Sequence, residues 1–289
     1  MDDGQKAGEF RAQVERLVAA GKLTAEEGAE LLAGMDDSPS GAGGGERAGE
    51  QTTDVPPDLF LEVRGFSLQV VEDSSVNVPQ LHVSEEGRAL LRPTPQGWQV
   101  VEAPGSGGRS WQNVRAILTL PFAPRHVQAE LRGGNIVLPA LGGELKAEVR
   151  GGNLRAQEVQ ALRASVRGGN ITVGEVAGQT DLSVQGGNLS VQGAAGLNAS
   201  VQGGNLDWAG TLSAGDHRAE VHGGNIRLRL LPGSSVRLEA DLTAGNFSAD
   251  FPTHKSGASV RTHHQGQLGA GDARLSCQVM AGQLRVVTQ

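Results

Sequence analysis

The sequence predicts an all-β fold, a parallel β-solenoid (single-stranded β-helix) of about 17–18 residues per rung, preceded by a small α-helical hairpin. Three observations carry this prediction. The tripeptide Gly-Gly-Asn recurs six times at near-constant spacing, apolar residues occupy fixed positions on both sides of it, and no helical periodicity runs through the repeats. Because repeats of this kind stack one structural unit on the next, each repeat is expected to form one rung.

The Gly-Gly-Asn tripeptide is expected to form the corner of each rung. Its asparagines are separated by 18, 17, 18, 17 and 20 residues, and a degenerate Ala-Gly-Asn copy follows after 21. Glycine adopts positive φ without steric cost, and asparagine is well suited to turn geometry. With the side chains pointing into the corner, each amide can donate to one neighbour and accept from the other. This predicts a structural ladder of Asn135, Asn153, Asn170, Asn188, Asn205, Asn225 and Asn246.

Apolar columns flank the corner when each repeat is numbered from its asparagine as position 0. Residues two apart share a face of a strand, so positions −6 and −4 are expected inside one strand and +1 and +3 inside the next. A third short segment, around Val159, Val176 and Ala194, is expected to turn the chain back. The handedness of the coil is left open. Position +1 is filled by Ile136, Leu154, Ile171, Leu189, Leu206, Ile226 and Phe247, and position −4 by Leu131, Val149, Val166, Val184, Val201, Val221 and Leu242.

Residues 1–35 are expected to form a helical hairpin that acts as an interaction domain. Apolar residues at helical spacing mark the first helix, and Thr24 and Glu27 form a capping box that opens the second. Two helices of this length bury too little apolar surface to fold firmly alone. The hairpin is therefore expected to dock on a protein partner, on a second copy of the chain or on the solenoid.

The rest of the chain divides where its composition changes. Residues 36–58 are rich in Gly, Ser, Pro and charge, which predicts a flexible linker. Residues 59–289 are expected to form the solenoid, with irregular capping rungs over 59–125, regular rungs over 126–250 and degenerate rungs over 251–289. The last rung would leave an uncovered strand edge, which predicts a site for homo-oligomerisation.

Charge and composition narrow the classes of function. The net charge is −7, of which −6 belongs to the first 50 residues, so the solenoid is almost neutral and nonspecific nucleic-acid binding is not favoured. The polar amino terminus and the lack of long apolar runs predict a cytoplasmic protein without a membrane span. Surface association by a route without a signal peptide stays open as the alternative. The one cysteine, Cys277, falls in the inward column when Gln283 is taken as position 0, which predicts a buried, inert thiol.

Arginines are the best candidates for a binding site. Position −3 carries Arg150 and Arg167 in neighbouring repeats, and Arg155 and Arg163 lie nearby in the sequence. These four residues are the predicted anion-binding set, because stacked guanidinium groups can hold phosphates or other polyanions. The alternative interpretation is a solvated face whose charges are balanced by glutamates two residues before the arginines.

No pattern in the sequence predicts catalysis, a cofactor or a metal. Acidic residues are scattered over different repeat positions, and neither a phosphate loop nor a Ser-His-Asp set appears. His254, His263 and His264 are placed in an irregular loop, where they match no zinc signature and their role stays open. Positions of exposed type surround Trp98 and Trp111, but no basic run lies between them, so a platform for stacking bases has little support.

Several segments resemble a known family. Leu120-Pro121 before the first regular rung, the recurrent G-G-N-[LI] corners and the closing A-G-Q-L-R-V strand resemble the bacterial "putative adhesin" family of β-strand repeats, a family largely without assigned function. The segment from Val18 to Leu32 is similar to the short helical-hairpin (SHOCT-like) domain that precedes such repeats in proteins linked to cell-envelope stress.

The resemblance implies a non-enzymatic scaffold or adhesin-like interaction protein that works in envelope-stress signalling, with a protein partner bound by the hairpin. Two alternatives stay open. One is a self-assembling polymer of cytoskeletal type, built by end-to-end stacking through the C-terminal rung. The other is a polyanion or glycan binder that uses the arginines.

Overall fold

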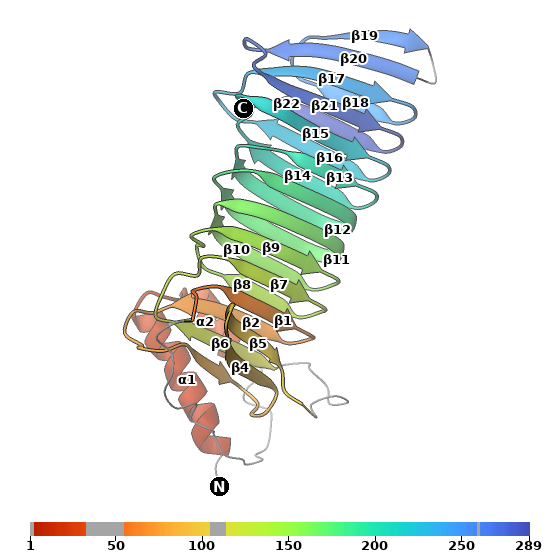
Figure 1. Ribbon diagram of the computed structural model, residues 1–289. Helices are drawn as coiled ribbons and strands as arrows, with labels where there is room; N and C mark the ends of the chain where they lie inside the picture. The colour runs from red at the N-terminus through yellow and green to blue at the C-terminus, as the bar shows by residue number, and fades with distance from the viewer. Residues whose placement is uncertain (1–2, 33–54, 105–113, 259–260) are drawn as a thin grey trace.

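The chain folds into an elongated stack of β-rungs with two helices at one end (Figure 1). The structure, a computed structural model, describes residues 3–32, 55–104, 114–258 and 261–289. Strands of successive rungs pair in parallel at positions one repeat apart, so that Leu154 pairs with Ile171 and Ile171 with Leu189. The predicted parallel β-solenoid is confirmed. Most of the predicted linker lies outside the described residues.

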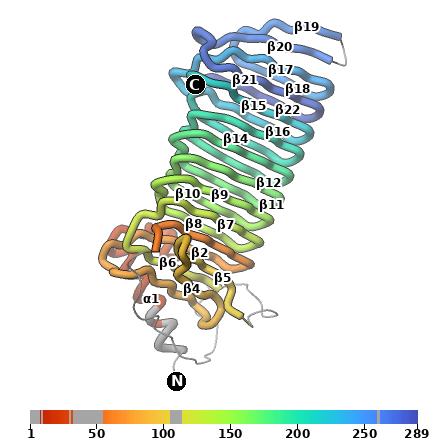
Figure 2. Tube along the Cα trace, viewed as in Figure 1, coloured from red at the N-terminus to blue at the C-terminus, as the bar shows by residue number. Residues whose placement is uncertain are grey.

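The central rungs follow the order of the sequence, and Figure 2 shows them as successive circuits of the chain. In most of them one strand precedes the Gly-Gly-Asn corner and another follows it, whereas two long strands run through the corner. The rungs are β7 (Val127–Leu131) with β8 (Asn135–Leu138), β9 (Glu144–Val149) with β10 (Asn153–Val159), β11 (Ala161–Val176), β12 (Thr180–Ala194), β13 (Asn198–Val201) with β14 (Asn205–Gly210), and β15 (Gly215–Val221) with β16 (Asn225–Leu230).

The predicted inward columns form one continuous apolar core. Exposed and buried residues alternate along β10 until position +3, and then the two exposed residues Gln157 and Glu158 precede the buried Val159. This break in the alternation bends the chain, and it produces the third segment of the rung. Val159, Val176 and Ala194 lie in this segment, as predicted, and all three are buried.

The second glycine of each corner is required by the stack. Gly187 has a φ of 81°, and a Cβ on it would overlap the carbonyl oxygen of Gly169 in the neighbouring rung. This close approach allows a backbone hydrogen bond between rungs. The corner carbonyl of one rung accepts the asparagine N–H of the next, as Gly152 does from Asn170 at 2.9 Å. The first glycine of this corner, Gly186, is less restricted, because its φ lies outside the left-handed region and a Cβ on it would meet its nearest atom at 3.9 Å.

The first full rung lies in the region predicted as an irregular cap. β1 (Leu59–Val63) and β2 (Ser67–Glu72) pair with β7 and β8, which aligns Leu61 with Ala129 and Ser67 with Asn135. The corner of this rung therefore reads Arg-Gly-Phe-Ser in place of Arg-Gly-Gly-Asn. The prediction that residues 59–125 lack the repeat is wrong for this rung. The Gly-Gly-Asn motif is not visible in its sequence, because phenylalanine and serine replace the second glycine and the asparagine.

The N-terminal end of the stack is closed by antiparallel strands. On the outer side of β1 and β2 lie β5 (Gly97–Glu102) and β6 (Arg115–Leu120), and beyond these lie β4 (Ala89–Thr94) and β3 (Gln80–Val83). Such a cover protects a sheet edge from pairing with another chain, as expected of a terminal cap. Trp98 on β5 is buried, and Trp111 lies outside the described residues.

The helical hairpin packs on the outside of the solenoid. It consists of α1 (Asp3–Ala19) and α2 (Ala25–Leu32). Buried residues of the hairpin, including Phe10 and Leu17, form a second small core with Val71 of β2 and Ile117 of β6. The Thr24 hydroxyl accepts the N–H of Glu27, and the Glu27 carboxylate accepts the N–H of Thr24, as the capping box predicts. Within the described chain, no helix is long and apolar enough to cross a membrane.

The C-terminal segment is inserted into the stack. The remaining strands are β17 (Val236–Leu242), β18 (Asn246–Ala249), β19 (Thr253–Ala258), β20 (Arg261–Leu268), β21 (Ala273–Val279) and β22 (Gln283–Thr288). β21 pairs with both β15 and β17, and β22 pairs with both β16 and β18. The expectation that residues 251–289 form only degenerate rungs is therefore wrong, because residues 273–288 form a regular rung. The expected uncovered edge of the closing strand is also wrong, because β22 is paired on both sides.

An antiparallel hairpin extends the stack beyond β17 (Figure 1). His254 lies on β19, and His263 and His264 lie on β20, so the predicted irregular loop is wrong. The His264 ring lies 4.9 Å from the ring of Phe247, at the end of the core. His263 Nδ1 lies 2.7 Å from an Asp241 carboxylate oxygen on β17.

Cys277 is expected to be chemically inert in the folded protein. It occupies the inward −6 column, as predicted, and burial raises the pKa of its thiol to about 12. Because the thiolate is the reactive species, iodoacetamide at pH 8 should leave the native thiol unmodified and should modify it fully after denaturation in urea. Mass spectrometry of both samples checks this, and rapid labelling of the native protein would contradict the buried placement.

Candidate functional site

The corner asparagines form a hydrogen-bonded ladder along the outside of the stack. Asn170 donates from Nδ2 to Asn153 Oδ1 at 2.7 Å, and Asn188 donates to Asn170 at the same distance. The bonds described run from Ser67 of the first rung to Asn225. The central asparagines are exposed, and each amide donates to one neighbour and accepts from the other, as the ladder prediction requires. Asn246 lies one rung beyond Gln283, because β22 is inserted between β16 and β18.

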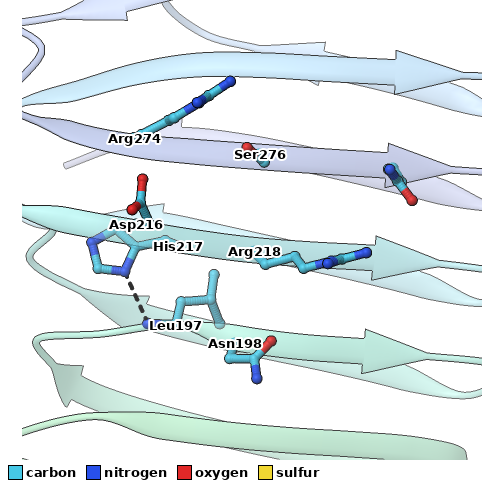
Figure 3. A pocket seen from close by; sticks show the side chains of 8 residues that line it. Leu197, Asn198, Asp216, His217, Arg218, Arg274 and Ser276 are labelled. Carbon is cyan, nitrogen blue, oxygen red and sulfur yellow. Dashed lines mark hydrogen bonds between the residues drawn. The ribbon is translucent and has the colours of Figure 1, made fainter.

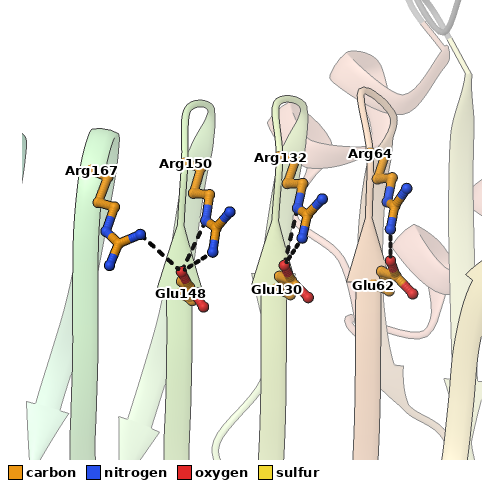
Figure 4. Close-up of polar contacts among 7 residues, drawn as sticks. All are labelled: Glu62, Arg64, Glu130, Arg132, Glu148, Arg150 and Arg167. Atoms are coloured by element: carbon orange, nitrogen blue, oxygen red, sulfur yellow. Dashed lines mark hydrogen bonds and ion pairs between the residues drawn. The ribbon is translucent and has the colours of Figure 1, made fainter.

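A second outer column next to the corner consists of arginines, with a column of glutamates beside it (Figure 4). Arg64, Arg132 and Arg150 each pair with the glutamate two residues before, which are Glu62, Glu130 and Glu148. Arg167 has a serine at that place, and it reaches Glu148 of the neighbouring rung at 3.9 Å. The hydrogen bond from Arg150 lowers the pKa of the Glu148 carboxyl. This column is therefore largely charge-balanced.

The four predicted anion-binding arginines do not converge on one point. Arg150 and Arg167 share the column of Figure 4, both within 3.9 Å of Glu148. Arg163 lies four residues before Arg167 on β11, 3.9 Å from Glu144 and 3.8 Å from Asp181. Arg155 lies on β10, beyond the corner, where it pairs in register with Thr172.

A polar groove lies on the outer face formed by β13, β15 and β21 (Figure 3). Its volume is about 620 Å³. Charged and amide side chains from three neighbouring rungs line it, and buried groups form its floor. The lining residues are Leu197, Asn198, Asp216, His217, Arg218, Arg274, Ser276 and Gln278.

The groove arises from a longer repeat. The step from Asn205 to Asn225 is 20 residues, whereas the step before it is 17. β15 therefore begins at Gly215, three residues before the point where Arg218 pairs with Asn198 of β13. Over these residues β15 pairs with β21 alone, so one side of the strand faces the groove.

His217 seals the step between β13 and β15. Its side chain is buried, its Nδ1 accepts the N–H of Leu197 at 3.3 Å, and its Nε2 lies 3.0 Å from the carbonyl oxygen of Ala214. Both bonds form when the neutral ring carries its proton on Nε2. Burial lowers the pKa of His217, although the bond to Ala214 and the charge of Asp216 oppose this effect.

The folded protein should lose stability below about pH 6.5, the ordinary pKa of histidine, because protonation removes the acceptor that His217 offers to Leu197. A folded-state pKa below the unfolded value means that the contribution is complete above pH 6.5 and is lost as the pH falls. We expect His217→Asn, which retains an acceptor near the Nδ1 position, to show a weaker decline. Urea midpoints of both proteins between pH 5 and pH 8 test this, and parallel declines would contradict it.

Metal-binding chemistry has no visible centre in the described part of the chain. Among these residues, no three His, Cys, Asp or Glu side chains gather in a way that could hold an ion. The residues that come together are instead arginines, amides, hydroxyls and paired carboxylates, which recognise polar groups by hydrogen bonding.

Sequence reasoning did not find the groove. Its two arginines, Arg218 and Arg274, belong to rungs that become neighbours only because β21 is inserted beside β15. The sequence does contain one indication of the groove: the spacing from Asn205 to Asn225 is longer than the spacing before it, which shows that one rung has extra residues.

Comparisons with known proteins found structural likeness alone. No family model matches the chain, and the search of curated proteins gave no match. The chain is similar to a crystal structure named a putative adhesin from Bacteroides fragilis, at 11% identity and a TM-score of 0.47, over 80% of this chain and 92% of the other. It is also similar to one named a putative cell adhesion protein from Clostridium sporogenes, at 12% identity and a TM-score of 0.24, over 82% and 97%.

Proposed function

We propose that the chain is a non-enzymatic, adhesin-like interaction protein that binds an extended polar ligand, such as an oligosaccharide, in the groove on β13, β15 and β21. The observation that carries this proposal is the groove itself, which collects polar side chains from three rungs on one outer face. Adhesion is the role for which the two similar structures are named.

The rigidity of the stack supports a binding role. Each rung is hydrogen-bonded to its neighbours by backbone ladders, and the asparagine bonds add a side-chain ladder along the corner. Polar groups held on strands lose little conformational entropy when a ligand binds. Arg274 is additionally held by Glu239 at 2.7 Å, and Arg218 is paired with Glu220.

A bulky residue in the groove tests the proposal. Ser276→Trp would fill the groove, and because Ser276 points outward the core should be unaffected. Gln128→Trp is the matched control, since Gln128 has the same repeat position on β7, away from the groove. On an array of neutral and acidic oligosaccharides we expect the native chain and Gln128→Trp to bind the same members and Ser276→Trp to lose them. Equal binding by all three proteins, or none by the native chain, would refute the proposal.

The other predicted roles stay predictions. Envelope-stress signalling through the hairpin would require a partner that binds its outer face or displaces it, because Phe10 and Leu17 are buried against the solenoid. End-to-end assembly would have to use the outermost strands β18 and β19 in place of β22. Polyanion binding by Arg150, Arg155, Arg163 and Arg167 would have to compete with carboxylates near three of them.

A further inference from the structure

Two exposed arginines lie side by side on the face beyond the corner. Arg227 of β16 and Arg285 of β22 are register partners in neighbouring rungs, and both side chains are exposed. Neighbouring strands are about 4.8 Å apart, so the two side chains leave the sheet within reach of a single small ligand. Only the insertion of β22 brings them together, because stacking in sequence order would place Arg227 beside Ser248.

The carboxylates near this pair are engaged with other groups. Asp207, the register partner of Arg227 in the preceding rung, is held by Arg229, with 3.1 Å between Oδ1 and Nε. Asp250 accepts the N–H of Thr288 at 2.7 Å and also its hydroxyl. Within the described ranges, neither Arg227 nor Arg285 forms an ion pair. Like charges directly opposite on adjacent strands are destabilising. Since Asp207 is bound to Arg229 and Asp250 to Thr288, the two arginines carry positive charge that no ion pair among the described residues offsets.

In the arginine column near the corner, the positive charges are compensated by nearby carboxylates. Arg64, Arg132 and Arg150 each have a glutamate two residues earlier on the same strand, so the fold supplies a partner wherever those arginines stack. Around Arg227 and Arg285 the outward neighbours are Arg229, the Asp207 carboxylate that Arg229 holds, and the uncharged side chains of Asn225, Gln283, Ser248 and Val287. The contrast separates a structural column from a surface that is prepared for an external anion.

We propose that Arg227 and Arg285, together with the hydroxyl of Ser248, form a binding site for a tetrahedral oxyanion, the sulfate or phosphate ester of a larger molecule. Ser248 is the register partner of Arg285 on the other side, so the three residues form a row across three rungs. An ester of this type presents three accepting oxygens, which allows it to bridge two guanidinium groups and one hydroxyl. Such bridging suits guanidinium groups better than ammonium groups, because their donors are held in a planar fork.

Titration with inorganic sulfate and, separately, with inorganic phosphate at low ionic strength tests the site. We expect saturable binding to the native chain, about tenfold weaker binding to Arg285→Gln, and none to Arg227→Gln/Arg285→Gln. Arg132→Gln is the matched control, because it removes the same charge from the compensated column, and it should bind like the native chain. Preference for sulfate or for phosphate, followed by retention on heparin against polyphosphate, identifies the source of the ester.

The inference is overturned if neither anion binds saturably, or if Arg132→Gln weakens binding as much as Arg285→Gln does. It stands apart from the proposed function of the groove, which lies on the other side of the corner. Ser276→Trp should leave sulfate and phosphate binding unchanged, so failure of one site is distinguishable from failure of the other. Because both arginines are exposed, circular dichroism of the variants should match the native chain and exclude unfolding as the cause.

Discussion

Replacing Gly187 with alanine is expected to cost more than about 4 kcal/mol of folding free energy, a value that only the most disruptive substitutions reach. The positive φ alone costs an alanine about 1–2 kcal/mol. In addition, its Cβ would overlap the carbonyl oxygen of Gly169 and lie 3.0 Å from the nitrogen of that residue. The overlap is with backbone, which can move only if the two rungs separate.

Gly186→Ala is the matched control, since it adds the same methyl group one residue earlier. The φ of Gly186 lies outside the left-handed region, and its Cβ would be 3.9 Å from the nearest atom. We expect its effect to stay within about 1 kcal/mol. Urea unfolding of both variants measures the difference, and similar midpoints would show that the corners are not stacked as described.

Val279→Asp should be the second most damaging change, although it lies close to the end of the sequence. Val279 is buried between the register partners Val221 and Leu242, so the variant would place a carboxylate in a dry core without a partner. Burying such a charge costs several kcal/mol, and a loss of about 4 kcal/mol or more is expected. A C-terminal rung at the open end of the stack would tolerate the change far better.

Met280→Asp controls for the added charge. Met280 follows Val279 directly and is exposed, with 53% of its surface accessible. Its replacement should leave the free energy of unfolding within about 0.5 kcal/mol of the native value. Hydrogen exchange should also show faster opening of β15 to β18 in Val279→Asp alone. If the two variants were equally stable, β21 would not be an internal strand.

The central rungs could be predicted because each repeat position has one physical task. Positions such as those of Leu154 and Val166 must be apolar since they face the core, and the second corner glycine must lack a side chain since the next backbone occupies its space. These demands recur at every rung, so periodicity alone reveals them. The strand order followed from the nearly constant spacing of the corners.

The two ends of the stack could not be predicted, because periodicity does not determine the order in which rungs stack. Rungs with identical columns fit on one another in any order, so periodicity does not tell whether β22 follows β18 or lies between β16 and β18. At the amino end, Phe66 and Ser67 occupy the positions that glycine and asparagine have in later rungs, so the motif is absent although the rung is present. Stacking order is decided by connections and end strands, which do not repeat.

The candidate sites depend on that unpredicted order. The groove and the pair of Arg227 and Arg285 both require β21 and β22 to lie next to β15 and β16. The arginines near the corner were found from the sequence because they stack in sequence order. Their charge balance was only partly foreseen, since Arg167 finds its carboxylate on the neighbouring rung.

A disulfide between engineered cysteines tests the stacking order most directly. Glu220 and Gln278 are outward register partners on β15 and β21, so cysteines at these positions should form an intramolecular disulfide. The experiment uses a Cys277→Ala background, which suits the inward column because alanine occupies it in most other rungs. The account predicts an oxidised peptide pair for Glu220→Cys/Gln278→Cys and none for Glu220→Cys/Asp241→Cys, whose residues are two rungs apart. The reverse result by mass spectrometry would contradict it.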